Sequence, residues 1–333
     1  MEDGDVAKVT SDAVVIFDAD RNQVERRVLV STLSDAETEL EGYAHFMKKE
    51  IHEQTRAITE TLEGRLGADS VLELPFGENA REIFDKTKEI KIIACGTSYN
   101  AASVARYWFE EFAGVSCNVE IASEYRYRKS FVRPNSLLVT ISQSGETADT
   151  LAALEMAKEK GATLFGIVNV VGSSIARMSD SGIYTHSGTE IGVASTKAFT
   201  GQLAAITLIA IKMAKQLGSI TNENYADLKR SLALIPKKMS TVLLQKEEIF
   251  KIADEYSKPE YRDFLYLGRG INFPIALEGA LKLKEVSYVH AEGYPAGEMK
   301  HGPIALVDEN CPSVFIAPTD KSYDKVLSNM QEI

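Results

Sequence analysis

Short apolar segments alternate with helix-like segments through the middle of the chain, and this alternation limits the possible folds more than any other feature. The apolar segments lack interspersed polar residues, so both faces of each strand are expected to be buried. Five strands are expected, at 90–94, 117–121, 136–141, 164–168 and 182–185. Helices are expected between them, near 99–113, 147–160 and 196–217. This order predicts an α/β fold, a flavodoxin-like parallel sheet covered by helices on both faces.

A second unit of the same kind begins with the apolar segment 264–270. When Gly96 is aligned with Gly268, Asn100 falls on Asn272, and each asparagine follows an apolar strand at the opening of a helix. The sequence therefore indicates a divergent duplication. Few residues follow Gly268, so the second unit is expected to be incomplete.

Two further elements are expected before these units. Residues 5–30 alternate apolar and polar around the turn 18–22, which predicts a hairpin without evident partners. Residues 35–62 carry apolar side chains at helical spacing among many charges, which predicts a connecting helix.

Composition excludes several classes of protein. The net charge of -11 argues against a general nucleic-acid binder. The longest apolar stretch, 203–211, is too short for a membrane span, and the acidic start 1–5 does not suit a signal peptide. Cys95, Cys117 and Cys311 lack the spacing of a metal site. We expect a cytoplasmic protein with no cofactor, no metal and no membrane or nucleic-acid partner.

Two loops of the first unit are rich in small hydroxyl side chains. They contain Cys95, Gly96, Thr97 and Ser98, and Ser142, Gln143, Ser144 and Thr147. Each loop follows a buried strand and opens a helix, so hydroxyls and free backbone N–H groups meet at the positive end of a helix dipole. Hydroxyls there can simply cap the helix. Two such loops, without the glycine pattern of a dinucleotide site, favour a phosphorylated small molecule that is not a nucleotide.

A helix of the second unit carries three charged residues on one face, namely Glu278, Lys282 and Glu285. A charged stripe is usually exposed to solvent. Here the surrounding residues of 276–283 are mostly small or apolar, so we expect the helix to be largely buried. A carboxylate beside an ammonium in such a setting is suited to moving a proton between a carbon and an oxygen.

Two other segments are candidates. His301 lies in a loop with Gly302 and Pro303, where an imidazole could act as acid or base near neutral pH. The loop that contains Val193 and Ser195 ends at a helix start; it could close over a sugar or serve only as a helix cap. The remaining histidines are expected to be structural: His45, His52, His186 and His290.

Five short segments together carry a resemblance to a known family. They are Ala94–Asn100, Ser142–Thr150, Gly188–Lys197, Ala276–Glu285 and Lys300–Pro303. In sequence and order they resemble the isomerase half of the glutamine–fructose-6-phosphate aminotransferases, the glucosamine-6-phosphate synthases. The resemblance implies tandem sugar-isomerase (SIS) units.

The resemblance also implies a substrate and roles for individual residues. The phosphate of fructose 6-phosphate would lie against the loop of Ser142 and Thr147, and the sugar against the loops of Thr97 and Ser195, with glucosamine 6-phosphate as product. Glu285 would shuttle a proton between carbons 1 and 2, with Lys282 and Glu278 beside it. His301 would open the sugar ring from the other subunit of a homodimer.

Two departures from the family pattern suggest an internal piece of a longer protein. No cysteine precedes Cys95, so the glutaminase nucleophile is missing, and the chain stops before the family's C-terminal lysine. We expect a glutaminase domain in the full-length chain, of which 1–32 is a remnant. A helical linker would follow at 33–80, the first SIS domain at 81–220, and a connecting helix with a truncated second SIS domain at 221–333. We expect this piece alone to form no product from glutamine and to be at most weakly active with ammonia.

Two alternatives compete with an aminotransferase. A phosphosugar-sensing SIS regulator would keep the hydroxyl loops but would not need Glu278, Lys282 and Glu285 on one helix face. A related phosphosugar isomerase or deglycase would not need the N-terminal hairpin. The aligned charges and the hairpin favour the aminotransferase.

Overall fold

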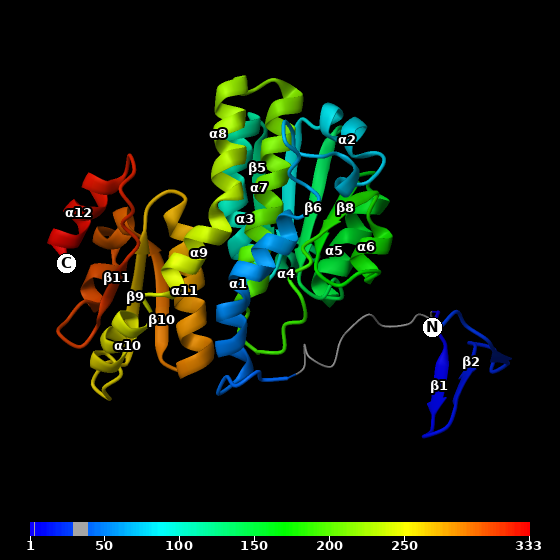
Figure 1. Cartoon of the computed structure of the whole chain (residues 1–333), viewed down its shortest axis with the longest axis horizontal. Coiled ribbons are helices and arrows are strands. Elements are labelled where there is room, and N and C mark those ends of the chain that lie inside the picture. The colour runs from blue at the N-terminus through cyan, green and yellow to red at the C-terminus, as the bar shows by residue number, and fades with distance from the viewer. Residues whose placement is uncertain (3, 29–38) are drawn as a thin grey trace. The chain divides into compact units, whose positions relative to one another are not determined.

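The computed structural model describes residues 1–2, 4–28 and 39–333 (Figure 1). These residues form two compact units, Met1–Glu39 and Leu40–Ile333, and each is treated by itself. The expected helix start at 35–38 and the apolar position Val30 lie outside the described residues.

The N-terminal unit is a small antiparallel sheet of three strands, β1 (Val6–Val9), β2 (Val14–Phe17) and β3 (Gln23–Val24). The predicted hairpin is β2–β3, and the Asp18 carboxylate holds its turn by accepting the N–H groups of Asp20 and Asn22 at 2.9 Å. The expectation of a hairpin without partners was wrong, because β1 pairs with β2. Val28 lies outside the strands and is exposed.

The larger unit, Leu40–Ile333, contains both of the expected α/β units and begins with α1 (Phe46–Leu62), which starts later in the sequence than the connecting helix was expected to start. A parallel sheet follows, with the strand order β5-β4-β6-β7-β8. Its five strands lie within one or two residues of the predicted bounds: β4 (Glu89–Ala94), β5 (Ser116–Ile121), β6 (Ser136–Ser142), β7 (Thr163–Val168) and β8 (Ser181–Tyr184).

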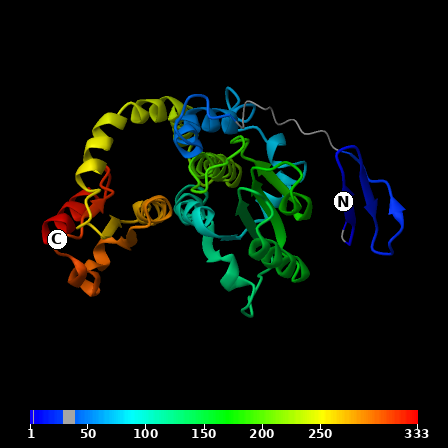
Figure 2. The same cartoon turned by 90° about the horizontal axis from the view of Figure 1, so that it is seen from below.

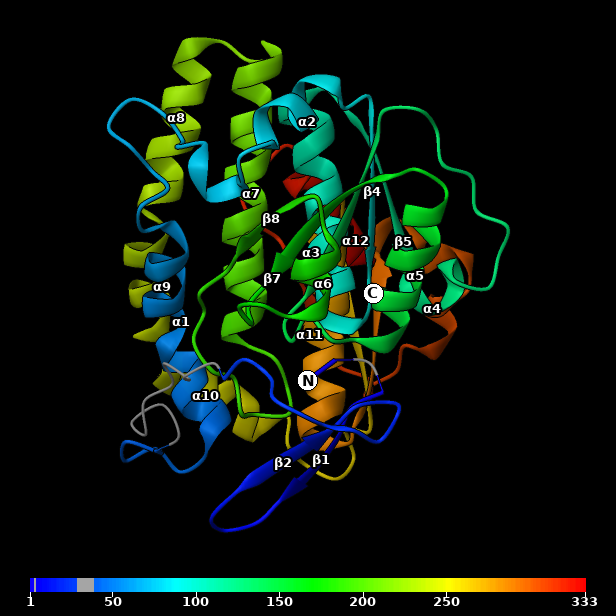
Figure 3. The same ribbon diagram turned by 90° about the vertical axis from the view of Figure 1, so that its right-hand side faces the viewer.

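Helices cover both faces of this sheet, as the apolar strands predict (Figure 3). One face packs against α1, α2 (Ala80–Lys86), α3 (Gly96–Trp108) and α7 (Lys197–Leu217). The other packs against α4 (Ala122–Tyr125), α5 (Ala148–Glu159) and α6 (Ser174–Met178). Neighbouring strand residues serve opposite faces, since Ile92 belongs to the first core and Ile93 to the second.

The helix α7 contains the apolar stretch 203–211 and agrees with the helix expected near 196–217. By length and composition it could cross a membrane, but most of it is buried within the fold, as in the core helix of a globular domain.

Three helices, rather than the single connecting helix that was expected, lead to the second sheet. They are α8 (Asn222–Ala233), α9 (Ile235–Leu243) and α10 (Lys246–Glu255), which form the arc seen in Figure 2.

The second sheet has the parallel order β10-β9-β11, formed by β10 (His290–Pro295), β9 (Asp263–Gly268) and β11 (Ser313–Phe315). The helix α11 (Asn272–Ser287) follows β9 and packs against α3 of the first sheet. The short helical turns η4 (Ala296–His301) and η5 (Pro303–Leu306) and the helix α12 (Tyr323–Glu332) complete the unit. Strand β10 was not predicted from the sequence.

Candidate active site

A pocket of about 250 Å³ opens at the carboxyl edge of the first sheet. The loops after β4, β6 and β8 line it, together with the end of β6, the first turn of α3 and one residue each from α7 and α11. The lining residues are Cys95, Thr97, Ser98, Ile141, Ser142, Gln143, Ser144, Thr147, Val193, Ser195, Gln202 and Glu285. The fold thus brings together most of the residues singled out in the sequence, as expected where parallel strands end at one edge.

The hydroxyls of the β6 loop are not used to cap a helix. Thr147 occupies the N-cap position of α5, but its side chain makes no capping hydrogen bond. Its hydroxyl lies 3.0 Å from that of Ser142, which also accepts the N–H of Gly145 at 3.0 Å. The Ser144 oxygen accepts the N–H of Glu146 at 3.1 Å, which leaves its own proton free for a ligand.

Gly145 is required for the shape of this loop. Its φ of +67° is left-handed, and a Cβ there would lie 2.0 Å from the hydroxyl oxygen of Ser173. The next residue closes the loop, because Glu146 accepts the N–H of Ser174 at 2.7 Å. That backbone hydrogen bond holds the pKa of Glu146 below its ordinary value. The loop is therefore fixed before any ligand arrives.

The three charged residues of α11 form one connected group. The Lys282 ammonium lies 2.5 Å from Glu285 and 3.4 Å from Glu278. Glu278 is buried, whereas the side chain of Glu285 is 32% exposed. The prediction of a largely buried helix therefore holds for its first turns and is wrong for the last turn, where Glu285 reaches the pocket rim.

Thr97 joins this charged group to the first unit. Its hydroxyl donates to Glu278 at 2.9 Å and accepts from Lys282 at 3.0 Å. Asn100 on the same helix donates to the second oxygen of Glu278 at 2.8 Å. Glu278 and Lys282 do not line the pocket themselves; they hold Glu285 and Thr97, which do.

Gln202 is a pocket residue that sequence reasoning missed. Its amide N–H donates to the Ser98 hydroxyl at 3.0 Å, while its carbonyl oxygen is buried and has no hydrogen-bond partner. The available signal was an amide within the otherwise apolar stretch of α7, since buried polar groups need partners or a function.

His301 does not line the pocket; it lies exposed at the end of η4. Gly96 opens α3 with a left-handed φ of +52°, between the pocket residues Cys95 and Thr97. His45 is the N-cap of α1 and accepts the N–H of Lys48 at 3.3 Å. Among the described residues, no group of three or more His, Cys, Asp or Glu could hold a metal ion.

The fold and this pocket define a class of protein, the SIS-domain proteins, and comparison agrees. The SIS domain family matches residues 83–212 and 261–331. A tagatose-6-phosphate ketose/aldose isomerase from Escherichia coli, 18% identical with a TM-score of 0.65 over 87% of this chain and 78% of its own, shares the fold.

Closer relatives narrow the class. The glutamine–fructose-6-phosphate aminotransferase [isomerizing] of Vibrio vulnificus is 50% identical over all of this chain. The C-terminal domain of glucosamine-fructose-6-phosphate aminotransferase from Francisella tularensis is 48% identical, with a TM-score of 0.85 over 88% of this chain and 82% of that domain. The chain therefore belongs to the glutamine–fructose-6-phosphate aminotransferase family and corresponds to its SIS half. It spans 54% of the length of the Vibrio relative.

Proposed function

We propose that this chain binds fructose 6-phosphate and performs the proton transfer that, with ammonia, yields glucosamine 6-phosphate. The observation that carries the proposal is the joining of two kinds of group at one pocket. The first unit supplies a fixed loop of hydroxyls and N–H groups, and the second supplies the Glu285 carboxylate.

The phosphate is assigned to the loop of Ser142, Gln143, Ser144 and Thr147. This loop opens α5, so its N–H groups and the helix dipole favour an anion. The free proton of Ser144 can donate to a phosphate oxygen, and so can the one proton that Ser142 and Thr147 do not use in their mutual hydrogen bond. Thr97, Ser98, Val193 and Ser195 are assigned to the sugar, since they line the rest of the pocket.

The proton transfer is assigned to Glu285. Its carboxylate would take the proton from carbon 1 of the ketose-derived intermediate and return it to carbon 2. Lys282 balances the negative charges of Glu285 and Glu278 and keeps the two side chains in place. Glu278 in turn holds Thr97.

The rest of the assembly is proposed from the relatives' name and from the resemblance. Ammonia would come from glutamine in a glutaminase domain of the full-length protein, of which residues 1–32 would be a remnant. The exposed His301 would enter the pocket of the other subunit in a homodimer and open the sugar ring. The proposed location is the cytoplasm.

Calorimetric titration of fructose 6-phosphate into the parent and the Ser144→Ala variant tests the binding assignment. Loss of one charge-assisted hydrogen bond should weaken binding about tenfold. Ser123→Ala, on α4 and outside the pocket, is the matched control and should bind like the parent. Equal affinity of the parent and Ser144→Ala would refute the phosphate assignment. A phosphosugar-sensing regulator would bind the sugar but exchange none of its carbon-bound protons.

A further inference from the structure

The loop from residue 185 to residue 196 carries Val193 and Ser195 to the pocket without support from secondary structure of its own. It connects β8 to α7. Apolar packing gives this segment little support, since Val193 is 99% exposed and only the small side chain of Ala194 beside it is buried. Polar contacts hold the backbone on either side of these residues.

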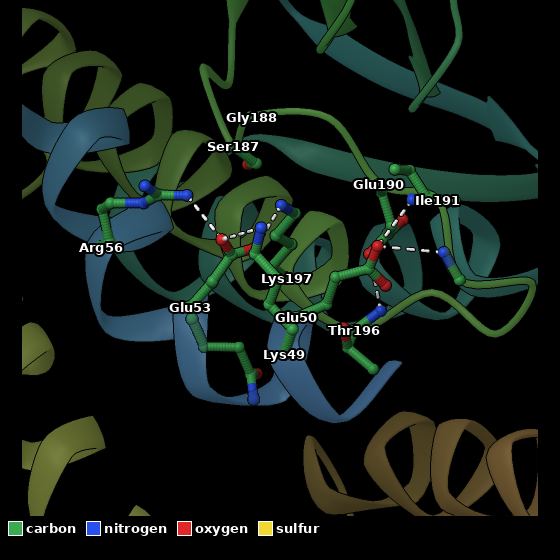
Figure 4. Close-up of polar contacts among 12 residues, drawn as sticks. Lys49, Glu50, Glu53, Arg56, Ser187, Gly188, Glu190, Ile191, Thr196 and Lys197 are labelled. Carbon is green, nitrogen blue, oxygen red and sulfur yellow. Dashed lines mark hydrogen bonds and ion pairs between the residues drawn. The ribbon is translucent and has the colours of Figure 1, made fainter. Parts of the chain in front are cut away.

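Glu50 of α1 makes one such contact (Figure 4). Its buried carboxylate accepts the backbone N–H of Ile191 at 2.6 Å and that of Gly192 at 3.0 Å. A Cβ on Gly192 would lie 2.5 Å from the second oxygen of Glu50, so the close approach requires glycine. A carboxylate that receives two backbone donors away from water holds the loop more firmly than neutral acceptors would.

Glu53, almost one helical turn further along α1, holds the far end of the same segment. It accepts the ammonium of Lys197, the first residue of α7, at 2.6 Å, and the Lys197 side chain is only 3% exposed. Arg56 pairs with the other oxygen of Glu53 at 2.7 Å. Figure 4 shows both carboxylates reaching from α1 toward the loop.

The loop contributes its own carboxylate to the same arrangement. Glu190 accepts the N–H of Thr196 at 2.8 Å and that of Ala198 at 3.2 Å, and so takes the place of a side-chain cap on α7. Residues 193–195 are therefore held from both sides, by Glu50 before them and by Glu53 and Glu190 after them.

We propose that Glu50 and Glu53 are positioning residues for sugar binding, although no residue of α1 lines the pocket. They fix segment 191–197 so that Val193 and Ser195 lie where the sugar is to bind. The inference rests on the proposed function, because it concerns the part of fructose 6-phosphate that lies beyond the phosphate. Displacements of a fraction of an ångström are enough to weaken such contacts.

The test uses Glu50→Ala, the conservative Glu50→Gln, and Glu63→Ala as a control at the exposed C-cap of the same helix. Calorimetry measures the binding of fructose 6-phosphate and, separately, of inorganic phosphate. Hydrogen exchange measures the amides of Ile191 and Gly192. In Glu50→Ala these amides should exchange faster and fructose 6-phosphate should bind about tenfold more weakly. Inorganic phosphate should bind as in the parent, because Glu50 holds the backbone of Ile191 and Gly192, whereas phosphate is assigned to the loop of Ser142.

Glu50→Gln retains an acceptor oxygen and should recover part of the lost sugar affinity, whereas Glu63→Ala should behave like the parent. Unchanged sugar affinity in Glu50→Ala would overturn the inference. So would an equal loss of sugar and phosphate binding, since it would indicate general damage. A parent chain that binds phosphate but no fructose 6-phosphate would instead refute the proposed function.

Discussion

The two parallel sheets of the larger unit share one topology and differ in what they bring to the pocket. In each, the first strand lies between the next two strands of the chain: β4 lies between β5 and β6 in the first sheet, and β9 lies between β10 and β11 in the second. In each, a helix follows the central strand. The shared order agrees with the duplication inferred from Gly96 and Gly268.

The loop after β4 places Thr97 and Ser98 in the pocket, while the corresponding turn after β9 holds Arg269, which instead donates to Asn329 of α12 at 3.0 Å. The second unit contributes Glu285, from the far end of α11. One topology thus supplies hydroxyls from a strand end and a carboxylate from a helix face. The difference teaches that one topology can serve two tasks, which under the proposed function are anion binding in the first unit and proton transfer in the second.

The largest expected effect comes from Glu285→Gln, which keeps the shape of the side chain without its basicity. The test uses a protein in which this chain is extended to the full length of its relatives. There the rate of solvent deuterium exchange at carbon 1 of the sugar should fall by about 10²- to 10⁴-fold. Binding of fructose 6-phosphate should stay within about twofold, because the hydroxyl loops are untouched. Proton NMR of the sugar in D₂O measures the exchange and calorimetry the binding.

Ser144→Ala is the converse variant and should lose affinity while exchange at saturating sugar persists. If Glu285→Gln lost binding and exchange to the same extent, the division of tasks between the two units would be wrong.

The next test compares the cores of the two sheets. Phe165 on β7 is fully buried in the same core as Phe84, and the centroids of the two rings lie 5.8 Å apart. Phe165→Ala should lower the free energy of unfolding by about 3–5 kcal/mol. Leu267→Ala on β9 should lower the free energy of unfolding by about 2–3 kcal/mol, because the core beside the second sheet is much smaller than the core that contains Phe165. Urea denaturation measures both, and an equal or larger cost for Leu267→Ala would reverse the ranking of the two cores.

The first sheet could be predicted from the sequence because its strands are apolar runs such as 90–94, and burial on both faces requires such runs. Strand β10 could not, since its sequence contains His290, Gly293 and Pro295. Gly293 lets the strand approach α11, where a Cβ would lie 2.8 Å from the Cα of Leu277. Tertiary packing, and not local preference, forms that strand.

The pocket residues on strand ends could also be predicted, because parallel strands bring their carboxyl ends to one edge. The loop anchor at Glu50 could not. Within a charged helix it resembles a surface residue, and its acceptor role depends on Ile191, which lies 141 residues away in the sequence. Glu285 was expected to be buried from the composition of its neighbours, which does not reveal where the helix leaves the core.

A smaller effect is expected at the junction between the units. Glu278 is buried and accepts from Thr97 and Asn100 of the first unit. Glu278→Gln keeps the volume, but its amide N–H₂ faces a donor, and the charge opposite Lys282 is lost. The free energy of unfolding should fall by about 1–3 kcal/mol. Thermal unfolding measures this. The control is Glu82→Gln, which removes one partner of the exposed ion pair between Glu82 and Lys86. An unchanged stability would show that the units associate without this contact.

The smallest expected effect is a pH dependence of the free energy of unfolding that comes from His186, in the loop after β8. Burial, with a contribution from the charge of Arg65, lowers the pKa of His186 below its ordinary value of 6.5. The unfolded chain then binds a proton more readily than the folded chain, so stability is lost as the pH falls through the region of 6.5 and below.

His186 has a left-handed φ of 51°, which asparagine tolerates. Between pH 7.5 and 5.5, His186→Asn should therefore lose less stability than the parent in urea denaturation. The difference should be below about 1 kcal/mol, because the side chain is partly exposed to solvent. Equal losses would show that the folded loop accepts the proton without cost.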